Sequence, residues 1–256
     1  MSKTGRKWLK TNWSDADCVR AQDIPFDNLN SIKGMMERLA LLSDRTITVN
    51  SNSTTLPEIQ TALDAVPRNL NGYTLDIAIP AATMTFAVLY SLKFSNFYGG
   101  NIVIHGVNST DTVLSFSNMT DACLFTFNGT SAMITVRDFK TVVTGNTTQN
   151  TFSIYNAPNV FFYNMKSYTA VTNKHRFIYA TMTSNINCQS TDVQGMDFAF
   201  NIQQLSHMYA NNITGSNNNY CFYAAGGFIV GYDPNISITG INKTGTSAGG
   251  TVSFTT

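Results

Sequence analysis

The chain has 256 residues, a formal net charge of +1 and only 12 % charged residues. A net charge this small gives no electrostatic reason to expect a nucleic-acid partner or an acidic membrane surface. Asn, Thr, Ser and Gly take the place of the missing charges, and the chain contains 17 Phe and 11 Tyr. Because aromatic and β-branched residues favour strands, we expect a mainly β fold.

The cysteines and histidines predict no metal site and no cofactor. The four cysteines are far apart and form no CxxC pair, which argues against a zinc site or a disulfide framework. The three histidines are equally dispersed. We expect no membrane span, because no apolar run is long enough, and no secretory signal, because no apolar segment follows the basic N-terminus.

Residues 1–45 form the first of the expected domains and contain both tryptophans, Trp8 and Trp13. An apolar pattern spaced by 3, 4 and 3 residues predicts a short amphipathic helix in this segment. Its members are Leu29, Ile32, Met36 and Leu39. Such a helix fits a site where three or more chains meet along an axis, and it equally fits packing on its own chain.

Residues 46–98 contain a polar linker, a second helix in LPEIQTALDAVP and the first strands. Pro57 suits the first turn of this helix, and Pro67 lies just past its end. The stretch NFYGGNIVIHG follows, with Gly99 and Gly100 before an alternating strand. A phosphate loop would need a helix after the glycines, so we interpret them as a tight corner.

Residues 99–240 contain a repeat in which two short alternating strands recur without any helix. Its equivalent apolar positions are 26, 26, 22 and 21 residues apart, at Ile134, Val160, Ile186, Met208 and Ile229. Such periods are typical of a solenoid, and strand-only units predict a parallel β-helix of about six coils. Residues 241–256 are expected to form a C-terminal strand or tail.

In a parallel β-helix, equivalent side chains of successive coils stack inside the solenoid. We expect an internal aromatic ladder of Phe125, Phe152, Phe177, Phe198 and Phe222. Asn128 and Asn156 are expected to stack as corner amides, which satisfy backbone groups where the chain turns.

Candidate catalytic residues are few. A glycoside hydrolase needs two carboxylates about 5 Å or about 6.5–9.5 Å apart. Asp192 and Asp197, on either side of a predicted corner, come nearest to such a pair, and His175 is the candidate base of a lyase. We expect no catalytic site and keep these three residues as a weak alternative.

Candidate binding residues are a cationic stretch and several tyrosines. Lys174, His175 and Arg176 either contact an anionic glycan or form the solvated tip of a loop. The ring of a tyrosine stacks on sugars and its hydroxyl bonds to them, but tyrosines are also common at subunit interfaces. Both uses remain open for the three tyrosines singled out, Tyr163, Tyr168 and Tyr209.

Residues 8–106 resemble tail-fibre and appendage proteins of phages and prophages of Gram-positive bacteria. The resemblance rests on DNLNSIKGMMERL, LPEIQTALDAVPRNLNGYTLDI and FYGGNIVIHG. It implies a right-handed, pectate-lyase-like β-helix, a homotrimer, and attachment to other virion proteins through the N-terminal segment. It also implies recognition of a host cell-wall glycan, with depolymerisation in some relatives.

The resemblance thus implies a fibre, spike or collar or head appendage, made in the bacterial cytoplasm and located on the virion. Because the chain lacks an obvious pair of acids, we expect it to be non-enzymatic. The alternative is a β-helical polysaccharide lyase or glycoside hydrolase. A bacterial surface adhesin is a third possibility, against which the missing signal peptide counts.

Overall fold

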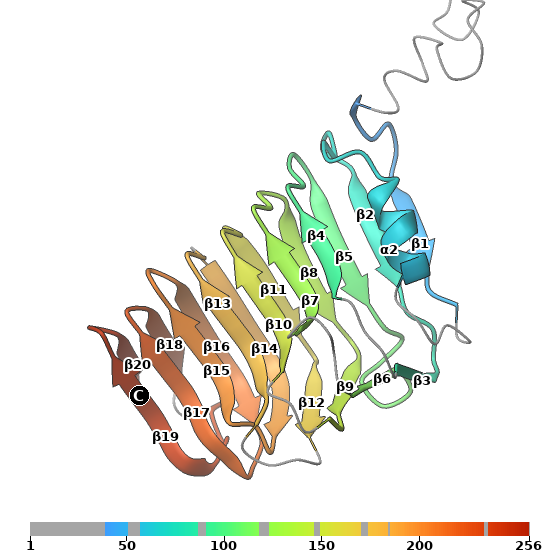
Figure 1. Cartoon of the computed structure of the whole chain (residues 1–256). Helices are drawn as coiled ribbons and strands as arrows, with labels where there is room; N and C mark the ends of the chain where they lie inside the picture. The colour runs from blue at the N-terminus through green and yellow to red at the C-terminus, as the bar shows by residue number, and fades with distance from the viewer. Residues whose placement is uncertain are drawn as a thin grey trace, which may run out of the picture.

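The chain folds into a parallel β-solenoid of about seven turns, which confirms the predicted mainly β class and adds a turn to the six coils expected. The computed structural model describes residues 39–50, 57–86, 91–117, 123–145, 149–169, 174–183, 185–232 and 235–255. The strands advance in order along one axis, with α2 beside the first coils and β19 and β20 at the other end (Figure 1). No helix in this described part is long and apolar enough to cross a membrane.

The strands form a 13-stranded sheet, called sheet 1, and a 7-stranded sheet, called sheet 2. Sheet 1 consists of two rows that meet at β14. Its long row contains β1 (Arg45–Thr48), β2 (Thr74–Ala78), β5 (Asn101–His105), β8 (Met133–Arg137), β11 (Asn159–Tyr163), β14 (Asn185–Gln194), β16 (His207–Thr214), β18 (Phe228–Tyr232) and β20 (Thr251–Thr255). Its short row contains β3 (Thr83–Phe86), β6 (Val113–Phe116), β9 (Lys140–Val143) and β12 (Lys166–Thr169).

Sheet 2 supplies the remaining side of each coil. Its strands are β4 (Leu92–Ser95), β7 (Cys123–Asn128), β10 (Asn150–Tyr155), β13 (Arg176–Thr181), β15 (Phe198–Gln203), β17 (Asn218–Ala225) and β19 (Gly240–Ser247). A complete coil thus runs from sheet 2 through the long row to the short row. The sequence repeat predicted two strands per coil and missed the short row.

The register of the long row confirms the predicted repeat. Ile134 pairs with Val160, Val160 with Ile186, Ile186 with Met208, and Met208 with Ile229. All five side chains are buried. The shortening of the period coincides with the loss of a separate short-row strand, because β14 and β16 run on across the corner instead.

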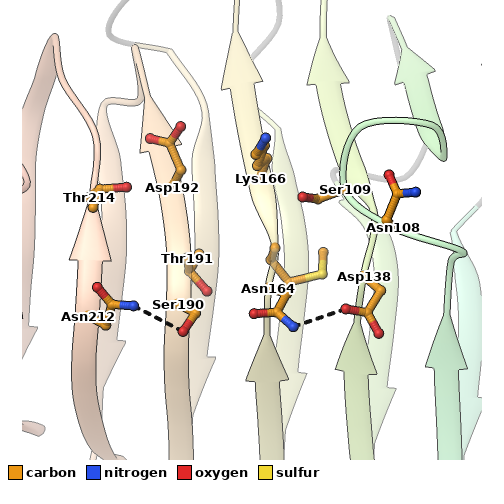
Figure 2. Close-up of a pocket in the computed structure, with 11 residues that line it drawn as sticks. Asn108, Ser109, Asp138, Asn164, Lys166, Ser190, Thr191, Asp192, Asn212 and Thr214 are labelled. Carbon is orange, nitrogen blue, oxygen red and sulfur yellow. Dashed lines mark hydrogen bonds between the residues drawn. The ribbon is translucent and has the colours of Figure 1, made fainter.

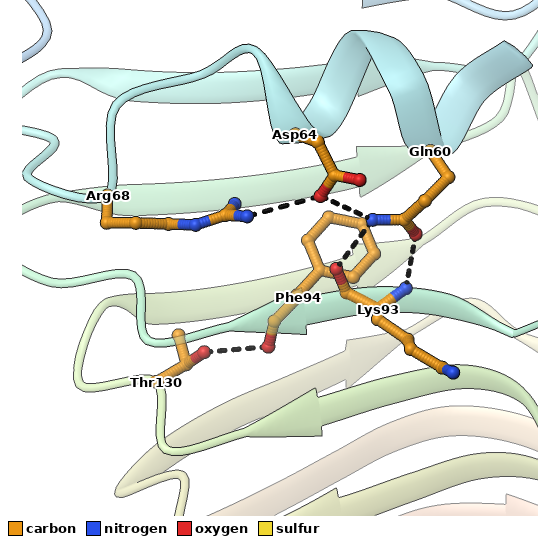
Figure 3. Close-up of polar contacts among 6 residues, drawn as sticks. All are labelled: Gln60, Asp64, Arg68, Lys93, Phe94 and Thr130. Atoms are coloured by element: carbon orange, nitrogen blue, oxygen red, sulfur yellow. Dashed lines mark hydrogen bonds and ion pairs between the residues drawn. The ribbon is translucent and has the colours of Figure 1, made fainter. Parts of the chain in front are cut away.

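The short helix α2 (Pro57–Asp64) covers one edge of sheet 2 (Figure 3). The Gln60 amide oxygen accepts the main-chain N–H of Lys93 at 2.7 Å, and its Nε2 donates to the Lys93 carbonyl at 3.3 Å. The Gln60 side chain therefore bonds to β4 as the backbone of another strand would. Asp64 holds this amide by accepting from Gln60 Nε2 at 2.9 Å and also pairs with Arg68 at 3.2 Å. Edge strands are exposed to unwanted pairing, and α2 blocks it at β4.

The core contains a stack of aromatic rings, but its register differs from the predicted ladder. The sheet 2 strands align Phe125, Phe152, Ile178, Phe200 and Phe222. Phe125 and Phe152 stack at 5.1 Å between ring centroids, and so do Phe200 and Phe222 at 5.2 Å. Aromatic pairs of this kind contribute about 0.5–1.5 kcal/mol each beyond the area they bury.

Two members of the expected ladder, Phe177 and Phe198, were therefore wrong. Phe177 is buried one position before Ile178, where its ring meets Phe152 edge-on at 5.5 Å. Phe198 is only half-buried and stacks on Tyr220 at 5.1 Å. Phe177 and Ile178 are consecutive and both buried, so the strict alternation fails in β13, and Phe198 lies two positions before Phe200, which is the residue aligned with Ile178.

The corner between the rows of sheet 1 is built by residues with left-handed backbone. Four non-glycine residues follow one another in this conformation on successive coils, namely Asp138 (φ 63°), Asn164 (φ 50°), Ser190 (φ 51°) and Asn212 (φ 52°). Short polar side chains tolerate this region best, because they bond locally. Each of these four coils therefore presents a polar side chain at this corner.

At another corner, close to sheet 2, a buried side-chain amide supplies the hydrogen-bond partners of several backbone groups. Asn218 is 1 % exposed, and its Oδ1 accepts the main-chain N–H of Met196 at 3.0 Å. Its Nδ2 donates to the carbonyl of Val193 at 2.9 Å and to that of Thr239 at 3.3 Å. One side chain thus joins the backbone of three successive coils.

The corner amides expected from the sequence, Asn128 and Asn156, do not stack on each other. Asn128 aligns with Tyr155, so that Asn156 falls one position later, at the level of Gly129. The corner at Gly99 exists as predicted, since Gly99 has φ +70° and lies between β4 and β5.

The solenoid extends on both sides of the expected range 99–240. β1 and β2 already pair in parallel before it, and β18 pairs with β20 after it. Of the residues expected to serve attachment and oligomerisation, Trp8, Trp13, Leu29, Ile32 and Met36 lie outside the described residues. Leu39 is described, and 71 % of it is exposed.

Candidate functional site

The outward face of the long row carries a groove between aromatic side chains, here called the outer groove. Its volume is about 460 Å³, and it is lined by Asn159, Phe161, Asn185, Ile186, Asn187, His207, Met208, Tyr209 and Val230. The strand register places Phe161, Asn187, Tyr209 and Val230 in a line across four coils. Adjacent strands are about 4.8 Å apart, so Phe161 and Tyr209 form walls about 9.6 Å apart with an amide between them.

The outer groove is apolar at its walls and neutral. Tyr209 and Val230 are each 42 % exposed, and they lie side by side in register with Phe161 on the same row, so that they form an apolar patch rather than single exposed residues. Asn185 Nδ2 donates to Asn159 Oδ1 at 3.2 Å, which fixes the two amides against each other. Among the described residues that line it there is no Asp, Glu, Lys or Arg. Aromatic walls with a few oriented polar groups are the usual chemistry of a site for a neutral organic ligand.

A second groove lies over the corner of sheet 1, on coils that overlap with those of the outer groove (Figure 2). This corner groove has a volume of about 480 Å³ and is lined by Asn108, Ser109, Asp138, Asn164, Met165, Lys166, Ser190, Thr191, Asp192, Asn212 and Thr214. Its floor is the row of left-handed corner residues described above. Asn164 Nδ2 donates to Asp138 Oδ1 at 3.1 Å, and Asn212 Nδ2 donates to Ser190 Oγ at 3.1 Å.

The Asp192 carboxylate is held by its own neighbours. The Tyr168 hydroxyl donates to Asp192 Oδ2 at 2.5 Å, and Gln194 Nε2 lies 3.2 Å from each carboxylate oxygen. Burial raises the pKa of Tyr168 to about 12, and the bond to Asp192 adds to this rise. Tyr168 therefore keeps its proton at neutral pH. The Lys140 ammonium lies 4.3 Å from the centre of the Tyr168 ring.

The structure places the three candidate tyrosines on one side of the molecule. Tyr209 is a wall of the outer groove. Tyr163 points outward from β11, and its ring lies parallel to that of Phe161 at 6.3 Å. Tyr168 stands on β12 beside the corner groove, where it bonds to Asp192.

The cationic stretch lies away from both grooves, where the chain enters strand β13 of sheet 2, and it does not form a solvated tip. Lys174 is exposed, but the ring of His175 is completely buried, and its Nε2 lies 2.9 Å from the Gly145 carbonyl oxygen. Burial lowers the pKa of His175. Arg176 packs its guanidinium 5.4 Å from the centre of the Phe198 ring. His175 thus cannot reach a surface ligand, and the expected exposure of this side chain was wrong.

Asp192 lies on β14 of sheet 1, whereas Asp197 lies just before β15 of sheet 2. A corner at Gly195 (φ +77°) separates the two residues. The Asp197 carboxylate accepts a hydrogen bond from Asn219 Nδ2 at 2.9 Å. Asp138 and Asp192 share the corner groove, but they are two coils and two register positions apart. This offset puts their Cα atoms roughly 12 Å apart, and bonds from Asn164 and from Tyr168 hold the two carboxylates to different neighbours.

Several residues of the grooves were not found from the sequence, among them Phe161, Asn185, Asn187 and Lys166. Phe161 belongs to a run of two phenylalanines, and only the register shows which one points outward. Lys166 lies on a short-row strand that the repeat did not reveal.

Comparison with protein-family models, with curated proteins and with solved structures finds no match for this chain. Within the described ranges, no group of three or more His, Cys, Asp or Glu side chains is arranged to hold a metal ion. The two grooves on sheet 1 are therefore the features on which a functional argument rests.

Proposed function

We propose that the chain is a glycan-recognising structural protein of a phage virion, a fibre, spike or collar or head appendage that binds a host-surface glycan without cleaving it. The outer groove is the observation that carries this proposal. Phe161 and Tyr209 offer ring faces to the C–H faces of sugars, and the amides of Asn159, Asn185 and Asn187 offer donors and acceptors to hydroxyl groups. The resemblance of residues 8–106 to phage appendages supports the location on a virion.

The test is binding to an array of bacterial capsular and cell-wall polysaccharides. We expect Tyr209→Ala to weaken binding at least tenfold, because it removes a wall of the groove. Tyr98→Ala is the matched control, since Tyr98 is also exposed, at 48 %, but lies outside both grooves. Equal effects of the two substitutions, or no binding to any glycan, would contradict the proposal.

As part of the same proposal, the protein is a homotrimer anchored through its N-terminal segment. Light scattering on the purified chain measures its mass in solution. A mass of three chains agrees with the proposal, and a stable monomer would contradict it.

A second candidate function is depolymerisation of the glycan, because the corner groove holds two carboxylates, Asp138 and Asp192. We expect no release of oligosaccharides from a glycan that the protein binds, since both carboxylates are engaged by neighbouring side chains. Release that Asp192→Asn abolishes, with binding intact, would establish an enzyme instead.

A further inference from the structure

We propose that copies of this chain associate through the outer face of sheet 2, where a cluster of aromatic side chains lies beside one charge of each sign. The inference rests on the homotrimer of the proposed function and deepens it, because it says which face the copies share. The partner is a second copy of this chain, and the outer groove on sheet 1 stays free for the glycan.

The aromatic cluster occupies four neighbouring strands of sheet 2, namely β10, β13, β15 and β17 (Figure 1). The rings of Tyr155 and Tyr179 lie 6.0 Å apart between centroids, and Phe198 stacks on Tyr220 at 5.1 Å. Tyr223 meets Phe198 edge-on at 5.1 Å and Tyr220 at 5.5 Å. All five side chains are partly exposed. A continuous apolar patch of this kind marks an interaction surface, whereas single exposed rings do not.

The rings close over polar side chains that also point away from the core. Ser153 and Asn201 follow the core residues Phe152 and Phe200 in their strands, yet they are only 1 % and 2 % exposed. Tyr179 pairs with Ser153 on one side and with Asn201 on the other. The polar groups of this face are therefore covered, and ring surface is what a partner meets.

The tyrosine hydroxyls of the cluster favour a protein partner over a glycan. The Tyr179 hydroxyl donates to Gln203 Oε1 at 3.1 Å, and the Tyr223 hydroxyl donates to Ser247 Oγ at 2.9 Å. Because both protons are donated within the chain, the cluster offers few donors to the hydroxyl groups of a sugar. Tyrosine and arginine are also the residues in which protein interfaces are enriched.

The charges beside the cluster make the face complementary to itself. The Arg176 guanidinium packs on two rings of the cluster, 5.5 Å from the centre of Tyr179 and 5.4 Å from that of Phe198. Asp197 lies on the next coil, where its carboxylate accepts the amide of Asn219. Across the described ranges, neither Arg176 nor Asp197 belongs to an ion pair. Arg176 of one copy and Asp197 of another therefore supply the two halves of a contact between copies.

The outer face of sheet 2 is also large enough for a stable interface. The sheet has seven strands, and its central strands have six residues. With about 4.8 Å between strands and about 3.3 Å per residue, the face covers roughly 600 Å². Two such faces together reach about 1,200 Å², where the range of specific interfaces begins.

The test is the mass of full-length variants in solution, measured by light scattering over a range of concentrations. Arg176→Asp should raise the concentration needed for half-association at least tenfold, because two carboxylates then meet across the interface. Asp197→Arg added to this variant should restore association, and failure to restore it would refute the charge contact. Tyr223→Ala should weaken association as well, since it removes a ring from the cluster.

The controls separate this inference from the proposed function. Arg45→Asp makes the same change of charge on β1 of sheet 1 and should leave the mass unchanged. A far-ultraviolet circular dichroism spectrum like that of the parent shows that a variant is folded. If the parent associates but Arg176→Asp and Tyr223→Ala do not change its mass, the sheet 2 interface is refuted and the homotrimer stands. If the parent is a monomer, the homotrimer and this inference both fail.

Discussion

Replacement of Asn218 tests whether buried corner amides hold the coils of this solenoid together. Asn218→Leu keeps a similar volume but removes the acceptor of the Met196 N–H and the donor to the Val193 carbonyl. A buried backbone group without a partner costs about 1–3 kcal/mol, so these two groups predict a loss of about 2–6 kcal/mol. Whole proteins are stable by only about 5–15 kcal/mol, so this one side chain is a large part of the total.

The assay is the denaturation midpoint, measured by circular dichroism in urea and on heating. For a chain of this size, a loss of about 3 kcal/mol lowers Tm by roughly 6–12 °C. Asn235→Leu is the matched control, because Asn235 is exposed, has no left-handed backbone, and bonds through its amide only to the side chain of Asn211 at the surface. A loss below about 0.5 kcal/mol for Asn218→Leu, the usual range for surface changes, would refute the reasoning.

Asn218→Asp adds a pH dependence of known sign. An ionised carboxylate would face the Val193 and Thr239 carbonyl oxygens without a proton to donate, so the fold favours the protonated acid and raises its pKa. The folded state then holds a proton that the unfolded state loses above about pH 3.9, and stability falls as pH rises. The variant should therefore approach the parent protein near pH 4 and fall below it at pH 7. A difference that does not change with pH would contradict this account.

Four further outcomes follow from the core, the cap and the buried titratable groups. Phe152→Ala should cost about 3–5 kcal/mol in urea denaturation, because Phe152 is fully buried among other rings, and a loss below 1 kcal/mol would count against the aromatic stack. Gln60→Leu should expose the edge of β4, and sedimentation should show more self-association than for Glu58→Gln on the same helix. Burial lowers the pKa of His175, so the folded state favours the neutral ring, and the stability that this ring contributes is complete above about pH 6.5 and declines as pH falls. His175→Gln should therefore reduce the change in the urea midpoint between pH 7 and pH 5. The same change in midpoint for both proteins would refute this. Burial raises the pKa of Cys188 to about 12, so its thiol should resist alkylation at pH 8 until the chain is unfolded, and rapid labelling of the folded protein would disprove its burial.

The sequence predicted the solenoid because one apolar position per coil recurs in the long row. Val160 and Ile186 lie on strands where alternation is regular, and there the inferred register is correct. The inferred register is wrong at Phe177 and Phe198, because consecutive residues are buried in β13 and β15. Where neighbouring residues are both buried, alternation does not show which apolar residue holds the ladder position.

The grooves were less predictable than the fold. Tyr209 was a candidate because it lies in a predicted strand among polar residues, where a tyrosine ring can stack on a sugar. Asn187 and Lys166 became candidates only when the register brought them beside residues from neighbouring coils. His175 was misjudged because a charged flank indicates exposure, whereas the fold of the corner turns its ring inward.

A crystal structure of the protein soaked with a glycan that it binds tests the central claim most directly. The account predicts a sugar ring against the face of Tyr209, with hydroxyl groups bonded to the amides of Asn185 and Asn187. A sugar bound on sheet 2, or anywhere that leaves the outer groove empty, would contradict it.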